Sequence, residues 1–338
     1  MIKKALRAIS SAWGQRFTLI VIICIVMAIF QPVFFRPNNA SNILQAIATI
    51  GIMVCGMLFT VLVGGLDLSV ASMAGLSASI TFKVAEQSGY TNGGFLSGCV
   101  IALLLCLVVG IINGSLVTQF GLPAFVVTLA MKYVLFGCIP FVTDGYLIIN
   151  PKNGLIHQLG NLVVFRIPIG SDILRVPMPI IILILVVAIT AFVLGKTTYG
   201  RKLYAIGGNK NVANLVGINS NMNIVAAFMI SSFLSGIGGI MLASMNGQGG
   251  LQTALGYEGN VLMAMVVGGI NLAGGEGGVP GAIFGALLVG IINNMMMLLG
   301  VSSDIQTFVR GIIILAAMTL NMYARRGTAG AMRLRIKS

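Results

Sequence analysis

Ten apolar stretches of about 20 residues follow one another along the chain, separated by short polar segments. A helix of about 20 residues crosses the hydrocarbon core of a bilayer, whereas the strands of a membrane barrel alternate in polarity over about ten residues. Hydrophobic residues make up 57% of the 338 residues and charged residues 8%, compared with roughly a quarter in soluble proteins. We therefore expect an all-α polytopic membrane protein with a single transmembrane domain over residues 1–338. The helices are predicted at 17–35, 43–63, 68–86, 95–119, 122–142, 177–195, 222–244, 256–272, 280–300 and 304–322. Small residues four positions apart predict tight packing between helices, at Gly110 and Gly114, Gly281 and Gly285, and Ser235 and Gly239.

Basic residues give the chain a net charge of +13 and lie mainly in residues 1–16 and 323–338 and in the interior segment 196–221. Lys and Arg concentrate in the cytoplasmic flanks of membrane proteins, so both termini and the interior segment are expected on the cytoplasmic side. The termini share a side only if the number of spans is even, which ten satisfies. The loop 143–176 would then lie outside, although its three basic residues conflict mildly with that side. This distribution favours contact with membrane lipid and does not indicate nucleic acid as a partner.

The sequence contains no recognisable catalytic, cofactor-binding or metal-binding pattern, so an enzymatic role is not expected. Residues 195–197, GKT, resemble the end of a phosphate-binding loop, but Thr190 occupies the position of its first glycine. The single histidine, His157, has no carboxylate or cysteine near it in sequence. The five cysteines all lie in apolar stretches without a C-x-x-C pair, as buried hydrophobic residues do.

An acidic residue, Asp67, interrupts the apolar sequence LVGGLDLSV, where an ion site, a catalytic acid and a helix cap are the alternatives. No partner ligand lies nearby in sequence, and Gly64 and Gly65 allow the chain to reverse direction. We therefore expect Asp67 to be the first residue of a helix, where its carboxylate accepts hydrogen bonds from free amide groups. Whether this acid is only a cap or also marks a hinge stays open. Glu258 is expected to begin a later helix in the same way.

Three polar features recur in the same order in the two halves of the predicted helix set. Each half has an acid at the start of its third helix, the sequence GIIN in its fourth and a basic residue within its fifth. The pairs are Asp67 with Glu258, 110–113 with 290–293, and Lys132 with Arg310. The recurrence favours two inverted halves of five helices, although a second match between VGGLDL and VGGINL would break that symmetry. Because the midspan charges are basic, they argue against a cation-coupled carrier; they line a polar path or extend to the membrane surface.

The interior segment TTYGRKLYAIGGNKNVANLVGIN, residues 197–219, is too apolar to be only a solvated turn. Asn209 can cap a short helix, on which Val212, Leu215 and Val216 share one side. Such a helix offers a docking surface to another protein, and the alternative is a helix that lies on the membrane surface.

Four motifs occur along the chain in the order GGLDLSVAS (64–72), YGRKLYAIGGNKNVANLVGI (199–218), GYEGNVLMAMVVGGINLAGGEGGVPGAIFGALLVGIINN (256–294) and LLGVSS (298–303). They resemble the membrane permeases of bacterial sugar ABC importers, with the ribose, xylose, arabinose and galactoside permeases as the nearest group and autoinducer-2 permeases beside them. The resemblance covers nearly the whole chain from about residue 17. It implies a permease of ten helices with inverted halves, present as a homodimer or a dimer of similar chains in the bacterial inner membrane.

The resemblance also implies a cytoplasmic ATPase subunit and a periplasmic sugar-binding protein as partners, and alternating access as the mechanism. Helix 209–218 would contact the ATPase, through Asn209, Val212, Ala213, Leu215, Val216 and Gly217. The turn 273–279 would be a second contact on that side or only a tight turn, and the loop 143–176 would receive the binding protein. The polar candidates for the sugar path, or for helix–helix hydrogen bonds instead, are Gln45, Asn113, Asn293 and Asn294.

Two other functions stay open at this point. A branched-chain amino acid, nucleoside or autoinducer-2 permease of the same superfamily would share the topology and the separate ATPase. A stand-alone secondary carrier would differ in class, because it would use an ion gradient. The sequence does not identify the sugar, since a separate binding protein would select it.

Overall fold

The computed structural model describes residues 12–149, 154–170 and 172–336, so the predicted basic ends 1–16 and 323–338 extend beyond the described ranges. The described chain is mostly helical, which confirms the predicted class, and each predicted range overlaps a helix. The helices are α2 (Ala12–Phe30), η1 (Pro32–Phe35), α3 (Pro37–Leu62), α4 (Val70–Gln87), α5 (Asn92–Gln119), α6 (Ala124–Thr143), α7 (Gly154–Asn161), α8 (Met178–Lys196), α9 (Thr198–Gly208), α10 (Lys210–Leu215), α11 (Ser220–Asn246), α12 (Tyr257–Val267), α13 (Val279–Leu298) and α14 (Ser303–Ile336).

Six of the described helices are long and apolar enough to cross a bilayer, namely α3, α5, α6, α8, α11 and α13. α12 has 11 residues, which span about 17 Å at 1.5 Å per residue, roughly half the hydrocarbon thickness. α4 has 18 residues but is rich in Ala and Ser, and nearly all of it is covered by protein. Ten crossings and two inverted halves therefore stay predictions.

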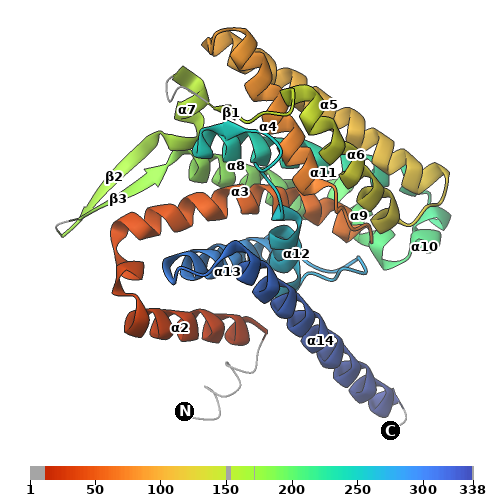
Figure 1. The fold of residues 1–338 in the computed structure, drawn as a ribbon. Helices are drawn as coiled ribbons and strands as arrows, with labels where there is room; N and C mark the ends of the chain where they lie inside the picture. The colour runs from red at the N-terminus through yellow and green to blue at the C-terminus, as the bar shows by residue number, and fades with distance from the viewer. Residues whose placement is uncertain (1–11, 150–153, 171, 337–338) are drawn as a thin grey trace.

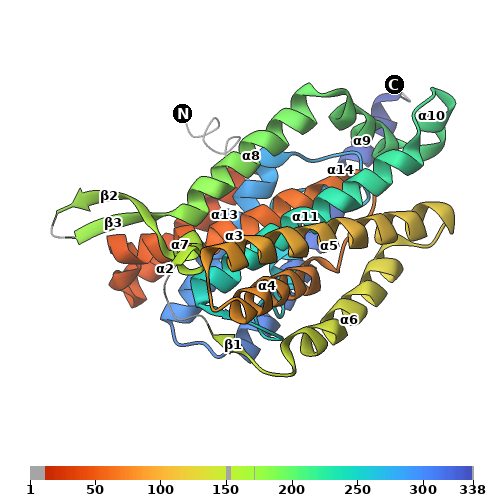
Figure 2. The same cartoon turned by 90° about the horizontal axis from the view of Figure 1, so that it is seen from above.

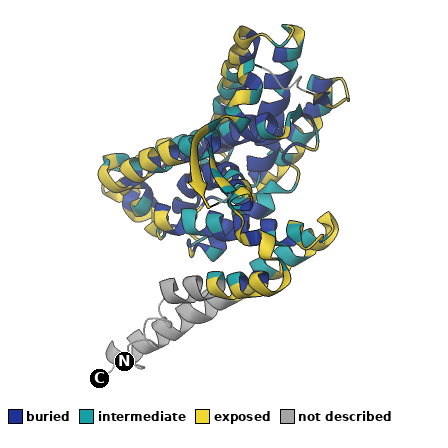
Figure 3. Ribbon diagram, turned by 90° about the vertical axis from the view of Figure 1, so that its left-hand side faces the viewer, coloured by how far each residue is buried: buried dark blue, intermediate teal, exposed yellow. Residues whose placement is uncertain are grey.

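Two helices occupy the centre of the bundle. α3 packs against α8, α11 and α13, and α4 packs against α5, α6 and α11 (Figures 1 and 2). Figure 3 shows buried residues concentrated in this centre and exposed residues on the outer faces of the bundle. Many of the exposed side chains are large and apolar, as on α5 and α8, which is the surface expected of helices that face lipid.

The bundle has two distinct ends. At the first, which we call the α10 end, the glycine-rich turn 273–279 meets the end of α3, where the amide of Gly275 donates to the carbonyl of Leu62 at 2.9 Å. At the other, which we call the β1–β4 end, strand β1 (Ile148–Ile149) pairs antiparallel with β4 (Gln248–Gly249). Figure 2 shows α10 and β1 far apart across the molecule, with α3, α5, α8 and α11 running between the two regions.

The long loop 143–176 contains regular secondary structure in its described parts. Besides β1 and α7, it contains strands β2 (Val163–Ile169) and β3 (Asp172–Pro177), which form an antiparallel hairpin that projects from the bundle (Figure 1). The amide of Arg175 donates to Ser41 Oγ at 3.0 Å and ties the hairpin to the start of α3. The sequence analysis predicted a loop here and no strands.

Close approach between helices depends on the small residues predicted for this purpose. A Cβ on Gly110 would lie 2.6 Å from Met229 Cα, and one on Gly114 would lie 2.6 Å from Val225 Cα, so α5 and α11 touch through their backbones. In the same way, Gly285 lies against the Ala264 carbonyl of α12. The predicted small-x-x-x-small pairs are therefore confirmed as packing contacts.

Candidate functional site

The segment between α8 and α11 forms two short helices with side-chain caps. The hydroxyl of Thr197 accepts from the Gly200 amide at 3.2 Å at the start of α9. The side chain of Asn209 accepts from the amides of Asn211 and Val212, at 3.0 and 3.1 Å, at the start of α10. Asn209 thus caps the helix as its position predicts. The two caps fix α10 as a separate helix that follows α9 after a single residue.

α10 presents an apolar face to the outside. Val212 is 53% exposed, Leu215 86% and Val216 70%, although all three are aliphatic. Ala213 points the other way and is buried, so among the predicted contact residues it anchors α10 to the bundle. Gly217 ends the helix with a φ of +83°, a conformation that favours glycine. We call Val212, Leu215 and Val216 the α10 face.

α9 meets the bundle through a contact between backbones. A Cβ on Gly207 would lie 1.9 Å from the Leu62 carbonyl and 2.3 Å from the Gly275 amide nitrogen, so no other residue fits without movement. The neighbouring Gly208 has no atom within 4 Å of the equivalent position. α9, the end of α3 and the turn 273–279 therefore touch with no side chain between them. We call this contact the glycine junction.

Tyr204 strengthens the glycine junction from the α9 side. Its hydroxyl donates to the Gly277 carbonyl at 2.9 Å. Burial raises the pKa of the Tyr204 hydroxyl above its ordinary value, so the hydroxyl remains a donor at physiological pH. The turn 273–279 is thus packed against α9, and any displacement of α9 also acts on this turn.

Asp67 lies in the connection between α3 and α4 and is fully buried. The expectation that it is the first residue of the helix is wrong, because α4 begins at Val70, three residues later. One carboxylate oxygen accepts from the amide and the hydroxyl of Ser69 at 3.0 and 2.6 Å. The other accepts from the hydroxyl of Ser231, in α11, at 2.7 Å. The acid therefore holds the turn before α4 and ties it to a distant helix.

Two further helices contribute polar side chains to the same connection. The amide nitrogen of Asn113, in α5, donates to Ser69 Oγ at 3.2 Å. Thr128, in α6, donates to the Leu66 carbonyl at 2.9 Å and accepts from the Leu68 amide at 3.1 Å. Thr128 of α6 thus bonds to the backbone of the connection between α3 and α4, whereas Asn113 of α5 and Ser231 of α11 bond to its side chains. Sequence reasoning did not single out Ser231 or Thr128, because serine and threonine are frequent in this chain.

Three charged side chains converge at the start of α12. Lys132 Nζ, from α6, lies 2.7 Å from a carboxylate oxygen of Glu258, with the side chains 26% and 21% exposed. Glu258 is in the first turn of α12, as predicted, but its carboxylate pairs with Lys132 and does not cap the helix. Arg310, from α14, also lies near the start of α12. One of its guanidinium nitrogens is 3.7 Å from the point where a Cβ atom would lie if Gly256 carried one. Among described atoms, Arg310 Nε is buried without a hydrogen-bond partner.

The four amides predicted for the path make different contacts. Asn294 exchanges two hydrogen bonds of 2.9 Å with Asn39 and so joins α13 to the start of α3. The Asn293 amide donates to Asn260 at 3.4 Å. Asn113 bonds to Ser69, and Gln45 is half-buried. The structure therefore places Asn113, Asn293 and Asn294 in contacts between elements, which is the alternative role given above.

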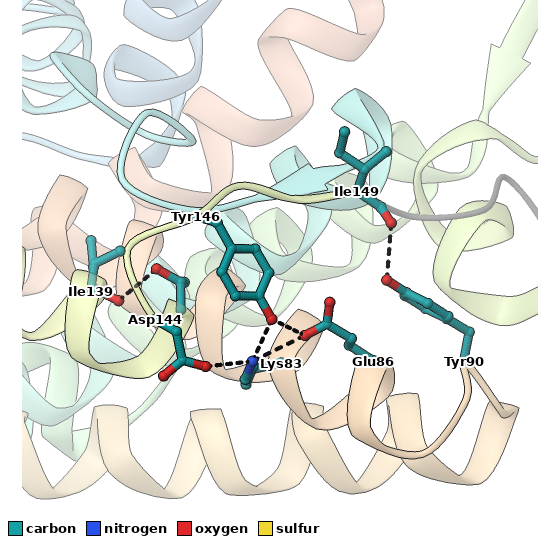
Figure 4. Close-up of polar contacts among 8 residues, drawn as sticks. Lys83, Glu86, Tyr90, Ile139, Asp144, Tyr146 and Ile149 are labelled. Carbon is teal, nitrogen blue, oxygen red and sulfur yellow. Dashed lines mark hydrogen bonds and ion pairs between the residues drawn. The ribbon is translucent and has the colours of Figure 1, made fainter.

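A second charged network lies at the β1–β4 end, close to the surface. Lys83 Nζ, near the end of α4, lies 3.1 Å from Glu86 and 2.9 Å from Asp144. The hydroxyl of Tyr146 lies 2.6 Å from Lys83 Nζ and donates to Glu86 at 2.6 Å (Figure 4). The Tyr90 hydroxyl donates to the Ile149 carbonyl at 3.0 Å in the same region. These contacts fix the start of the long loop against α4.

Over the described ranges, no three His, Cys, Asp or Glu side chains are grouped as metal ligands would be. The cysteines Cys55 and Cys106 are buried within the bundle. The arrangement consists of an exposed apolar helix at one end, polar breaks inside the bundle and a charged cluster beside α12.

Comparison with known proteins places these features in a family. A family model described as the branched-chain amino acid transport system permease component matches residues 39–318. The ribose import permease protein RbsC of Haemophilus influenzae is 33% identical over 312 residues, which cover 91% of this chain and 93% of that protein. The same permease of Bacillus subtilis is 34% identical over 308 residues and 89% of each chain. The L-arabinose transport system permease protein AraH of Escherichia coli is 33% identical over 319 residues, which cover 93% and 92%. No solved structure matches the chain.

Replacing Asp67 with Asn would leave one accepting oxygen where the carboxylate has two, while keeping the shape of the side chain. We expect the free energy of unfolding to fall by roughly 1–3 kcal/mol, the cost of leaving a buried polar group unsatisfied. The measurement is the melting temperature of the purified protein in detergent. The control is Asp304→Asn, at an exposed acid in the first turn of α14, which should lower stability by less than about 1 kcal/mol. Equal melting temperatures for the two variants would contradict the structural role of Asp67.

Proposed function

The chain belongs to the branched-chain amino acid transport system permease component family, and from this premise we propose that it is the permease subunit of an ABC importer for a small sugar. The observation that carries the sugar assignment is the identity of 33–34% with ribose import permeases over 89–91% of the chain. The four motifs of the sequence analysis support the same assignment. The protein is a multi-pass membrane protein, and we place it in the bacterial cytoplasmic (inner) membrane.

The two ends of the bundle face different partners in this proposal. The α10 end lies in the cytoplasm, where a separate ATPase subunit receives the α10 face, and both termini lie on that side. The β1–β4 end lies outside, where the loop 143–176, with its β2–β3 hairpin, receives a sugar-binding protein. A second permease, either another copy or a similar chain, completes the pathway. The exposed aliphatic side chains of α10 support the first contact, because an apolar helix face without cover is typical of a protein interface.

The proposed mechanism is alternating access driven by the ATPase. ATP binding brings two ATPase subunits together and displaces α10. Because α10 follows α9 directly, the displacement reaches the glycine junction and, through Leu62, the connection that contains Asp67. The Asp67 connection then acts as a hinge, since its backbone departs from helical geometry between α3 and α4. The charged cluster of Lys132, Glu258 and Arg310 lies beside the sugar path.

A second solute class has its own support. The matching family model is described by branched-chain amino acid transport, so leucine, isoleucine and valine are the next candidates. Nucleosides and autoinducer-2 follow from the wider resemblance alone. A secondary carrier is disfavoured, because the relatives are ABC permease components.

Uptake of labelled solutes tests the proposed function. Cells that lack their own ribose and arabinose importers receive this permease together with its cognate ATPase and binding protein. We expect ATP-dependent uptake of a labelled sugar that is lost when the permease is omitted. Labelled leucine, isoleucine and valine in the same cells test the second class. Uptake of leucine without any sugar would overturn the sugar assignment, and uptake by the permease alone in liposomes would overturn the ABC assignment.

Charge on the α10 face should separate the permease from its ATPase. The double variant Val212→Asp with Leu215→Asp should weaken ATPase association by at least about tenfold, because burying an unpaired carboxylate costs several kcal/mol. Copurification from membranes and uptake are the measurements. Asn211→Asp is the matched control, because it adds a negative charge to the same helix at an exposed polar position. If the double variant binds the ATPase as tightly as the control, the α10 face is not the contact.

A substitution in the glycine junction should lower uptake without affecting ATPase binding. Gly207→Ala would push α9 away from the Leu62 carbonyl, whereas Gly208→Ala meets no atom within 4 Å. We expect Gly207→Ala to keep ATPase association and ATP hydrolysis while uptake falls by about tenfold or more, since a 1–3 kcal/mol overpacking cost falls on the moving contact. Gly208→Ala should transport normally. Equal uptake in the two variants would exclude the glycine junction from coupling.

A further inference from the structure

A cavity of about 260 Å³ opens at the β1–β4 end, between the end of α6 and the segment that leads from β4 to α12. It is lined by Pro140, Thr143, Gly145, Tyr146, Leu147, Leu251 and Gln252. Its volume is slightly below the roughly 300–1,000 Å³ of drug-sized ligand sites, so it suits a molecule of monosaccharide size. The sequence motifs and the proposed coupling pathway do not account for this cavity.

The wall around Tyr146 is held rigidly. Its hydroxyl contacts Lys83 and Glu86, both at 2.6 Å, and Lys83 also pairs with Asp144 at 2.9 Å (Figure 4). The following residues pair with β4, since Ile148 lies opposite Gly249. Both sides of the cavity are therefore connected before any ligand arrives, which reduces the entropy lost on binding.

The lining combines groups suited to a neutral polyhydroxylated solute. Tyr146 is 44% exposed and offers an aromatic ring to the C–H face of a sugar. Gln252 is exposed and carries both amide donors and a carbonyl acceptor, which can bond to adjacent hydroxyl groups. None of the lining residues is an acid or a base. The nearby Lys83, Glu86 and Asp144 lie outside the lining, where the Lys83 ammonium pairs with both carboxylates.

A second, smaller cavity lies next to the first, toward the start of α4 and the middle of α6. Its volume is about 20 Å³, enough for a water molecule, and its lining includes Ser72, Lys132 and Glu258. Leu251 lines both cavities. This half-buried side chain therefore stands between the outer cavity and the Lys132–Glu258 ion pair.

We propose that the 260 Å³ cavity is an outer subsite for a neutral polyhydroxylated solute such as a monosaccharide, and that Leu251 separates it from the cavity beside Lys132 and Glu258. The proposal rests on the function proposed above for the substrate class, and it adds the place where the solute first rests on the permease. Affinity at this subsite is weak, because a tightly held solute would leave slowly.

Protection of a cysteine by ribose tests the subsite. Gln252→Cys is placed in the full-length permease in lipid nanodiscs, and the rate of alkylation by a charged, water-soluble thiol reagent is measured. We expect about 50 mM ribose to slow alkylation about tenfold if the Kd is roughly 5 mM, by mass action. Gln87→Cys is the matched control, because Gln87 is exposed at the end of α4 and does not line the cavity. The wild-type protein gives the background from the native cysteines.

Further variants test the role of Tyr146 in the cavity wall and the role of Leu251 between the two cavities. Adding Tyr146→Leu to Gln252→Cys removes the aromatic ring and should abolish protection, whereas Tyr90→Phe, in the same region but outside the lining, should preserve it. Ser72→Cys lines the inner cavity and is buried, so alkylation should be slow. Adding Leu251→Ala should speed that alkylation several-fold. An unchanged rate would overturn the role of Leu251.

The experiments can contradict the subsite and the proposed function independently of each other. If cells import ribose through this permease but ribose leaves the Gln252→Cys rate unchanged, the subsite is wrong and the function stands. If ribose protects Gln252→Cys while no sugar is imported, the subsite stands and the function fails. If about 50 mM leucine protects and ribose does not, both the solute class of the subsite and the sugar function are overturned.

Discussion

Irregular backbone that is buried within a protein must find its hydrogen bonds there, and this constraint organises the centre of the molecule. The connection between α3 and α4 departs from helical geometry for seven residues, 63–69, and four side chains satisfy or orient it: Asp67, Asn113, Thr128 and Ser231. A carboxylate can accept several hydrogen bonds at once, which is why a buried acid suits this position better than an amide. The helices that supply the donors are thereby held in place around the break.

The sequence predicts the class of the fold well, because the period and length of apolar stretches depend on neighbouring residues alone. It also predicts the cap at Asn209 and the small-residue contacts, since both are local patterns. The start of α4 is predicted two to three residues early, because the boundary depends on Ser231 and Thr128, far away in sequence. The β2–β3 hairpin is missed for a similar reason, since pairing between strands is not visible in a segment expected to be a loop.

The candidate sites also divide into those that a local sequence pattern predicts and those that depend on residues far apart in sequence. The α10 face follows from a local pattern of aliphatic residues, whereas the pairing of Lys132 with Glu258 joins residues 126 positions apart. For the polar amides in the spans, residue type alone does not distinguish a path residue from a packing contact. Asn294 is a path candidate in the sequence, and in the structure its two hydrogen bonds with Asn39 join α13 to the start of α3. The cavity beside Tyr146 depends on tertiary structure entirely.

The burial of α4 also constrains how the protein is made. Among its residues only Gln87 is exposed, and its interior contains Ser72, Ser77, Ser79 and Thr81, which suit a protein environment better than lipid. α4 leaves the ribosome early, yet α11, one of the helices that cover it, begins only at Ser220. During synthesis α4 therefore lacks part of its protein cover until α11 has been made, and β4 and α12, which also contact α4, follow later still. Assembly of the membrane domain is consequently completed late, and a chain released before α11 would carry an uncovered polar helix in the bilayer.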